Sequence, residues 1–444
     1  MRVARRRMVR AVRAFIAFVT CARETVDEAM TDAKVHAMMD DIAGWKRSTG
    51  KMRQLVRQMR ALRAAIAGEV ETTWGKLTHR TRGTFLRESL PRLCEFKERE
   101  AQIAAFGLVQ TLALHDDCAT ALATKEMFKL CVATIKGKDK ERAVAASGAL
   151  TTLVNHDDTR FLASDEGLDK SMTALITEKG LGVRVKRNCV VTFARIADDP
   201  EVASLMSAKA PEQLIKNFLD FVDKTDDTDT EKWALIAIAR LAMNDEFSNL
   251  MEKKGYVPFL FELSRDKIPA RKLAAALVIA HMARNKDLRE TLVKYRAIQL
   301  FCTIAMNTSE RIDMAEMQLV AALAIAELAL YEPNGERFCK QGALKWIIQL
   351  ARTGDVRSET AAITALSNLM LSPGNQSIMI VEDGTKVVDY LQNSRNPRVA
   401  HLAKQLLKRL RMAKLRAACK FAARMKATGN ALIDAGIEIG EGYE

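Results

Sequence analysis

The sequence predicts an all-α protein, a helical solenoid of about seven repeats with a helical extension at each end. Two observations lead to this prediction. Apolar residues recur at the i, i+3, i+4, i+7 spacing of one buried helix face. The same multi-helix pattern also returns every 41 to 46 residues, a period typical of helical repeat proteins. In such an array each repeat buries its apolar side against its neighbours, so we expect one continuous superhelix in place of several globular domains.

Residues 1–43 are expected to form a basic helix followed by an acidic one. The first 23 residues contain seven arginines and no acid. On a helical wheel Arg6, Arg10 and Arg13 lie on one side, with Phe15 and Val19 roughly opposite. This pattern indicates an organelle transit peptide, a helix that docks on the solenoid or another protein, or a membrane-surface helix.

Residues 44–98 predict a basic helical cap at the start of the solenoid. Apolar residues keep helical spacing at Leu55, Val56, Met59, Leu62 and Ile66. Arginines, including Arg57 and Arg60, stand beside them. A solenoid needs a cap to cover its exposed end, and the alternative is a helix that binds a partner.

Residues 99–395 form the predicted solenoid, and residues 358–394 show its pattern best. Ala362, Ala365 and Leu366 share one helix face, and Pro373 follows the end of that helix. A shorter helix then leads to Gly384, where we expect glycine to permit a sharp turn into a third helix. The same glycine recurs at Gly167, Gly255 and Gly342.

Seven positions align on Asn368 of the segment ALSNL and are called the aligned positions below. They are Thr111, Thr152, Arg195, Arg240, His281, Glu327 and Asn368. With the segments GALTTLVNHDD, TFARIADDPE, AIARLAMNDE, VIAHMARNKD, AIAELALYEPNGERF and ALSNLMLSPGNQ, the chain resembles the armadillo-repeat family. The resemblance implies a right-handed armadillo-type α-solenoid.

The resemblance also implies that the helices with the aligned positions line a concave groove. Nuclear-import receptors of this family place a tryptophan four residues before an asparagine there. The tryptophan positions of this chain hold Gly107, Gly148, Val191, Ile236, Leu277, Leu323 and Thr364. Since the asparagine survives only as Asn368, the resemblance does not extend to recognition of nuclear localisation signals.

The aligned positions from the third onward are the predicted partner-binding residues: Arg195, Arg240, His281, Glu327 and Asn368. The two arginines suit the carboxylates of an acidic extended or helical segment, as the resemblance to catenin-like proteins implies. The alternative is that these residues are solvated or pair with nearby acids.

Two acidic features lie between the predicted helices. The tripeptide His-Asp-Asp occurs at 115–117 and at 156–158, and nine residues from Asp223 to Glu231 contain five acids. A histidine with two acids could ligate a metal, and an acidic loop could hold calcium. We expect helix capping in both places, because carboxylates pair with the free N–H groups of helix starts.

Residues 396–433 predict a basic C-terminal capping helix, and residues 434–444 an acidic tail. The candidate anchors on this helix are Lys408, Arg411, Lys414 and Arg416. Residues 1–98 carry a net charge of +10 and residues 395–444 one of +7, out of +14 for the whole chain. The terminal helices are therefore the candidates for binding acidic protein, anionic lipid or nucleic acid.

The sequence contains no catalytic motif, and no metal site or cofactor is predicted. Its eight cysteines are scattered without metal-binding spacing, and its apolar runs are too short to span a membrane. We expect a non-enzymatic scaffold or adaptor that binds a partner along its concave face. The alternative is a permanent structural subunit of a large assembly. A cytoplasmic or cytoskeletal location is expected, with a mitochondrial one as the main alternative.

Overall fold

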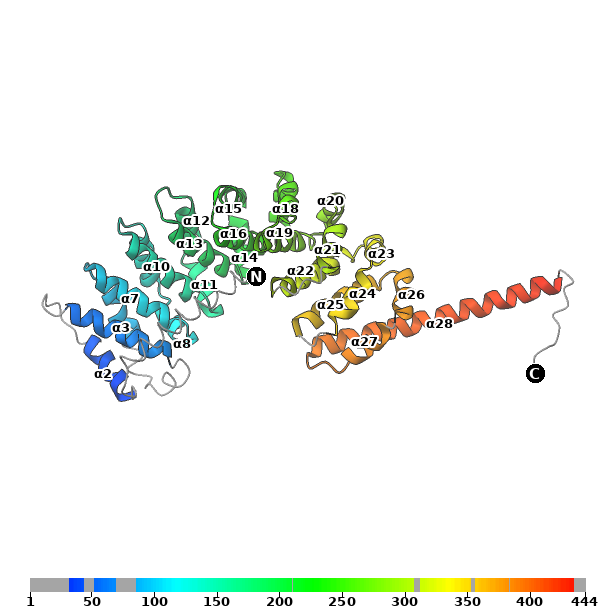
Figure 1. Cartoon of the computed structure of the whole chain (residues 1–444), viewed down its shortest axis with the longest axis horizontal. Helices are drawn as coiled ribbons and strands as arrows, with labels where there is room; N and C mark the ends of the chain where they lie inside the picture. The colour runs from blue at the N-terminus through cyan, green and yellow to red at the C-terminus, as the bar shows by residue number, and fades with distance from the viewer. Residues whose placement is uncertain are drawn as a thin grey trace, which may run out of the picture. The chain divides into compact units, whose positions relative to one another are not determined.

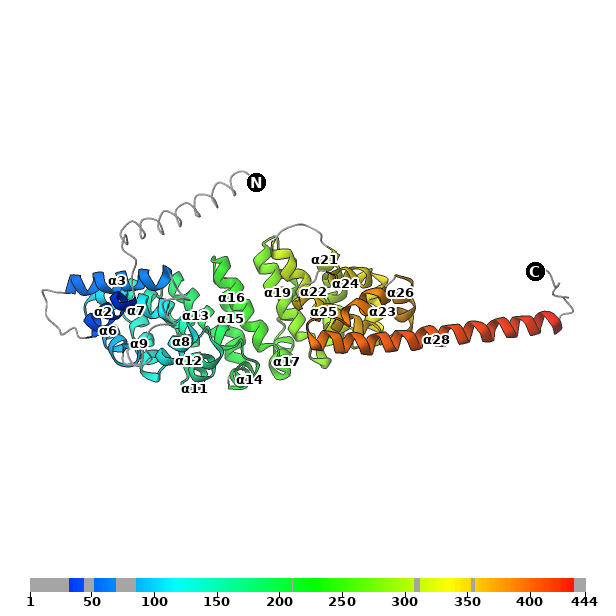
Figure 2. The same ribbon diagram turned by 90° about the horizontal axis from the view of Figure 1, so that it is seen from below.

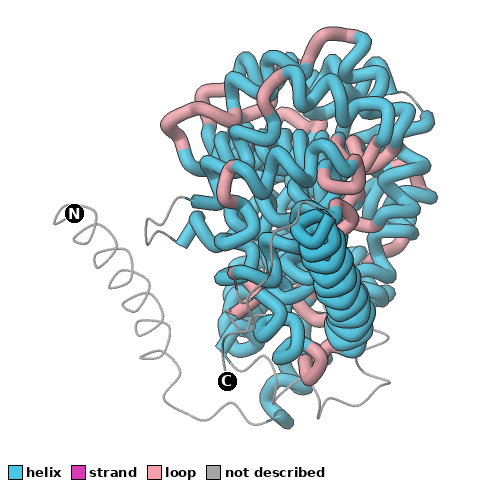
Figure 3. The backbone as a smooth tube through the Cα atoms, turned by 90° about the vertical axis from the view of Figure 1, so that its right-hand side faces the viewer, coloured by secondary structure: helices cyan, strands magenta, loops and turns pink. Residues whose placement is uncertain are grey.

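A computed structural model describes residues 32–43, 52–68, 85–209, 211–306, 312–352, 356–382 and 384–434. Within these ranges all regular secondary structure is helical and there is no strand (Figure 3). The predicted all-α fold is thus confirmed. The N-terminal basic segment with Arg6, Arg10 and Arg13 lies outside the described residues, as do residues 435–444 of the acidic tail.

The chain divides into two compact units, an N-terminal unit of residues 1–237 and a C-terminal unit of residues 238–444. The helices that lie wholly in the N-terminal unit are α2 (Asp32–Ala43), α3 (Met52–Gly68), the π-helix η1 (Phe85–Ser89), α6 (Leu90–Cys94), α7 (Arg99–Leu112), α8 (Asp116–Leu122), α9 (Lys125–Ile135), α10 (Lys140–Leu153), α11 (Asp157–Asp165), α12 (Leu168–Thr177), α13 (Val183–Ile196), α14 (Pro200–Lys209) and α15 (Pro211–Lys224).

Helix α16 (Thr228–Leu241) contains the boundary. The C-terminal unit continues with α17 (Asp245–Lys253), α18 (Val257–Leu263), α19 (Pro269–Met282), the 3₁₀ helix η2 (Lys286–Leu288), α20 (Arg289–Lys294), α21 (Ala297–Met306), α22 (Ile312–Leu328), α23 (Glu332–Lys340), α24 (Ala343–Leu350), α25 (Val356–Leu369), α26 (Pro373–Val381), α27 (Gly384–Leu391) and α28 (Pro397–Asp434).

Long helices pack side by side within each unit. In the N-terminal unit α3 contacts α7, α7 contacts α10, and α10 contacts α13 (Figure 1). In the C-terminal unit α19, α22, α25 and α28 contact one another in the same order (Figure 1). Their apolar faces are buried, as Phe106 of α7, Leu150 of α10 and Phe193 of α13 show. Each aligned position falls near the C-terminal end of one of the long helices α7, α10, α13, α16, α19, α22 and α25.

The glycines before the shorter helices play two different roles. Gly167, Gly255 and Gly342 have φ of 73°, 79° and 85°, a left-handed conformation that glycine adopts without a steric penalty. Gly384 is not in that conformation. A Cβ atom there would collide with the side-chain ends of Met379 and Ile348, so a larger residue would force these buried side chains to shift.

The two terminal long helices are packed to different extents. On α3 the predicted apolar face is buried, with Leu55, Met59 and Leu62 inaccessible. On α28 the buried face ends at Leu410, and Leu415 is 57% exposed. The rest of α28 extends beyond α26 (Figure 2). Among the described residues, no helix has the length and apolar character that a membrane span requires.

Candidate binding groove on the long helices

Three of the predicted partner-binding residues contact backbone of the long helix before their own. Nη1 of Arg195 donates to the carbonyl oxygen of Thr151 at 2.8 Å, and Nδ1 of His281 donates to that of Ala239 at 2.6 Å. Nδ2 of Asn368 donates to the carbonyl oxygen of Ala326 at 2.7 Å. The acceptors lie in the last turn of α10, α16 and α22, where helix carbonyls lack an intrahelical partner. Each side chain therefore satisfies an otherwise unpaired helix end.

The acceptor in each of these bonds lies one residue before an aligned position. A fourth bond of the same kind involves a residue that was not among the aligned positions. Nη1 of Arg409 in α28 donates to the carbonyl oxygen of Ser367 in α25 at 3.0 Å. Arg409 lies 41 residues after Asn368, and residues 406–410, LLKRL, match ALSNL. That match was the sequence signal that α28 continues the series of aligned positions.

The other aligned positions have different surroundings. Glu327 forms an ion pair with Arg289, with Oε2 3.9 Å from Nη2. Thr111 and Thr152 each donate from the hydroxyl to a carbonyl four residues earlier in their own helix. Arg240 is partly buried in the last turn of α16. The aligned positions thus serve contacts within the protein.

Burial shifts the proton affinity of two of these side chains. Desolvation lowers the pKa of His281 to about 4, so the ring is neutral at physiological pH and its Nδ1 carries the proton given to Ala239. Burial lowers the pKa of Arg195 as well, and the nearby charge of Arg160 adds to this effect. A cation in such a place gains from an anion brought close to it.

A groove of about 660 Å³ crosses α3, α7, α10 and α13 in the N-terminal unit. Its lining consists of Arg63, Ile103, Gly107, Gln110, Leu114, Glu141, Val144, Ala145, Gly148, Thr151, Thr152, Asn155, Arg184, Arg187, Asn188 and Arg195. Of the predicted partner-binding residues in this unit, Arg195 belongs to it, whereas Arg63, Arg184 and Arg187 were not predicted.

Two glycines on α7 and α10 hollow out this groove. Gly107 and Gly148 occupy the positions where the resembled receptors have tryptophans. A Cβ atom on Gly107 would come within 2.7 Å of Nη1 of Arg63, and one on Gly148 within 3.4 Å of Nε2 of Gln110. The missing side chain of Gly107 leaves room for the guanidinium of Arg63, whereas a Cβ atom on Gly148 would make an ordinary contact with the amide of Gln110.

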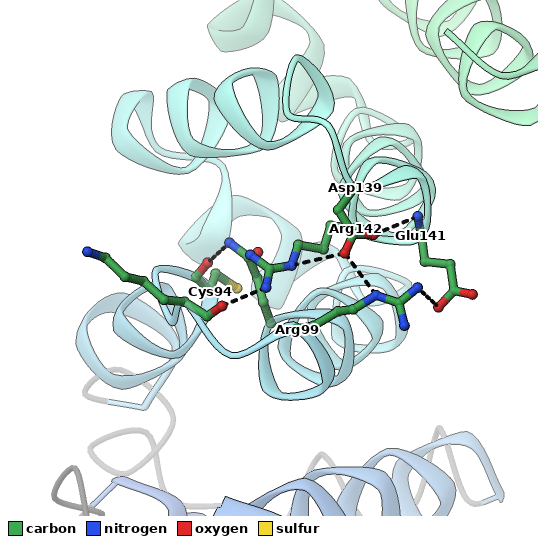
Figure 4. A network of polar contacts seen from close by, with 7 residues as sticks. Cys94, Arg99, Asp139, Glu141 and Arg142 are labelled. Carbon is green, nitrogen blue, oxygen red and sulfur yellow. Dashed lines mark hydrogen bonds and ion pairs between the residues drawn. The ribbon is translucent and has the colours of Figure 1, made fainter. Parts of the chain in front are cut away.

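The groove is positively charged, with four arginines and one carboxylate in its lining. Glu141 is paired with Arg99 at 2.9 Å, and Arg99 also holds Asp139, the N-cap of α10, at 2.8 Å (Figure 4). Arg187 forms a bidentate pair with Asp227, the residue before α16. Arg63, by contrast, donates to the neutral hydroxyl of Thr111 at 3.0 Å.

The acidic loops contact protein groups. Nε2 of His156 donates to the carbonyl oxygen of Ala113 at 2.7 Å, while its Nδ1 pairs with Asp116. Asp227 accepts from the backbone N–H of Thr230 at the start of α16, which begins at Thr228. Within the part of the chain that is described, no group of three or more potential metal ligands occurs.

The predicted anchors on the terminal helices are exposed wherever they are described. Arg57 and Arg60 lie on the outer face of α3, and Arg60 is 3.5 Å from Glu100 of α7. On α28 the predicted anchors Lys408, Arg411, Lys414 and Arg416 are all exposed. These four extend from the end of its packed part into its exposed part.

Comparison with solved structures supports a helical-repeat architecture. The chain is similar to the crystal structure of one engineered protein, with a TM-score of 0.58 and 17% sequence identity. The match covers 88% of this chain and 98% of the engineered chain. Crystal structures of two further engineered proteins match 56% and 55% of this chain at 19% and 20% sequence identity. These matches cover 97% and 98% of the engineered chains. Their TM-scores of 0.46 and 0.45 are too low to indicate a shared fold. No family model and no curated protein matches the sequence. The comparisons therefore establish the fold class alone.

Proposed function

We propose that this chain is a non-enzymatic, armadillo-type scaffold that binds an acidic segment of a protein partner in the groove across α3, α7, α10 and α13. The observation that carries the proposal is the excess of arginines in a groove hollowed by Gly107 and Gly148. Carboxylates match guanidinium groups in geometry and charge.

The shape of the groove favours an extended segment. Packed helices lie about 10 Å apart, so a chain that crosses four of them passes several arginines in turn. The amides of Gln110, Asn155 and Asn188 lie in the same lining, where amide groups can pair with a peptide backbone. Arg184 is the best test residue, because it is exposed and has no hydrogen-bond or ion-pair partner among the described residues.

The first experiment measures binding of a fluorescent poly-glutamate peptide to the full chain. Reversal of the charge in Arg184→Glu should weaken binding roughly tenfold or more. Lys170→Glu is the matched control, since Lys170 is an exposed cation on α12 outside the groove. Equal losses in the two variants would mean that only the net charge attracts the peptide, and the proposed groove would be rejected.

A second variant fills the groove without changing its charge. Gly148→Leu places a side chain over the hollow, and leucine favours helix more than glycine does. The variant should fold as well as the wild type but bind poly-glutamate less tightly. Unchanged binding would show that the peptide does not enter the groove.

The alternative, a permanent subunit anchored by its basic terminal helices, is favoured by the exposed part of α28. Replacement of Lys408, Arg411, Lys414 and Arg416 by glutamine should then release the protein from its native assembly. Gel filtration of a gently prepared extract measures this. If wild-type protein already migrates near its own 49.4 kDa, the alternative fails.

A further inference from the structure

A second cavity, in the C-terminal unit, differs from the groove in its ligand chemistry. It has a volume of about 580 Å³ and lies between α18, α19, α20 and α21. Its lining is Ser264, Arg265, Lys272, Lys294, Tyr295, Arg296, Gln299, Leu300, Thr303 and Ile304. Four of these ten residues are cations and none is an acid. Three other cavities of the described chain each have an acidic residue in their lining. These residues are Glu141 in the groove and Glu166 and Asp220 in the two others.

The backbone at Arg296 is the unusual feature of this cavity. Its φ is 70°, and it is the one residue other than glycine with positive φ among those described. It directly precedes α21, as Gly167 precedes α12 and Gly342 precedes α24. An L-residue with a Cβ atom pays a steric penalty in this conformation that glycine does not. An arginine at a position suited to glycine indicates that its side chain has a use.

The cations of the cavity are only partly neutralised. Arg296 and Lys272 have no side-chain hydrogen bond or ion pair with any described residue. Lys294 is 3.3 Å from Glu290, but both side chains are highly exposed, so their pairing is weak. Arg265 is held in place, since its guanidinium lies over the ring of Phe261 at 5.7 Å and donates to the carbonyl of Tyr295 at 3.4 Å.

Neutral donors complete the lining. The ring of Tyr295 stacks on Phe261 with centroids 5.8 Å apart, and Tyr295 is 39% exposed. The first turn of α21 follows Arg296, and its free N–H groups add a partial positive charge to that of the side chains. One arginine held in place, two lysines, a phenol and a helix start together suit a compact anion with several negative oxygens.

We propose that this cavity binds a compact polyphosphate, a small molecule or headgroup that carries two or more phosphate groups. The excess of cations favours an anionic ligand, because an anion brought among them offsets their mutual repulsion. Several phosphates are needed to engage cations that come from α19, α20 and the α18–α19 connection. The site is independent of the groove, which lies in the other unit.

The experiment uses the full chain and two probes, inositol hexakisphosphate in titration calorimetry and phosphatidylcholine vesicles with or without phosphatidylinositol bisphosphate in co-sedimentation. Binding of the soluble probe alone would assign a free ligand, whereas phosphoinositide-dependent co-sedimentation would assign a lipid headgroup. Binding of neither probe would overturn the proposal.

Arg296→Gly is the decisive variant, because it removes the guanidinium and restores the residue that the backbone conformation favours. We expect roughly tenfold weaker binding, with a melting temperature equal to or above that of the wild type. Lys272→Ala should also weaken binding. Lys340→Ala, which removes an exposed cation at the end of α23, is the control. The comparison is made with the probe that the wild type binds. If Arg296→Gly binds this probe as tightly as Lys340→Ala does, the probe does not occupy this cavity and the proposal is rejected.

Discussion

Arg195, His281 and Asn368 share one physical role despite their different chemistry. Each donates a hydrogen bond to a carbonyl oxygen at the end of the preceding long helix. An unpaired buried carbonyl costs about 1–3 kcal/mol, so each donor contributes to the packing of successive helices. The sequence predicted that these positions are equivalent. It did not predict their partners, since each acceptor is a backbone atom 42 to 44 residues away that has no side-chain signature.

His281 should make the stability of the C-terminal unit depend on pH. Its pKa is about 4 in the folded chain against an ordinary value of 6.5, so the unfolded chain binds the proton more readily. The stabilisation is complete above about pH 6.5 and is lost as the pH falls toward 4. Between about pH 7.5 and about pH 5 the free energy of unfolding should fall by about 2 kcal/mol from this residue. Urea unfolding at both values measures it.

His281→Asn is the matched variant, because asparagine donates to the same kind of carbonyl at Asn368 and does not titrate in this range. The loss of stability between the two pH values should shrink in this variant by about the contribution of His281. An unchanged loss would show that His281 is not the group that titrates.

At the scale of elements, the short helices were easier to locate than to explain. The recurrence of glycine predicted the starts of α12, α24 and α27, but the reason differs between Gly342, with positive φ, and Gly384, with close packing. No glycine marks the start of α21, where Arg296 takes the same conformation. Sequence patterns give helical periodicity, whereas backbone angles and contact distances depend on the neighbouring helices.

Gly384→Ala should destabilise the contact between α26 and α27 by about 1–3 kcal/mol, because its methyl group would overpack against Met379 and Ile348. Gly182→Ala is the control: it has an ordinary φ of −65° and no neighbour within 4 Å of its added methyl group. Thermal unfolding of both variants measures the difference. Equal melting temperatures would contradict the crowding at Gly384.

At the scale of the molecule, composition and period were sufficient for the all-α fold, and charge was sufficient to single out the terminal helices. The groove, by contrast, could not be predicted from the sequence alone. Arg63, Arg184 and Arg187 come from the cap and from the first turns of α13, away from any aligned position. Only the packing of α3 against α7 and of α10 against α13 brings them together.

The four hydrogen bonds to a last-turn carbonyl of the preceding long helix all run in one direction along the chain. In each of them the donor follows its acceptor in sequence, as from α13 back to α10 and from α28 back to α25. During synthesis the acceptor helix is therefore completed before the residue that will satisfy its last turn has been made. A growing chain that ends after α25 would carry an open carbonyl at Ser367 until translation reaches Arg409.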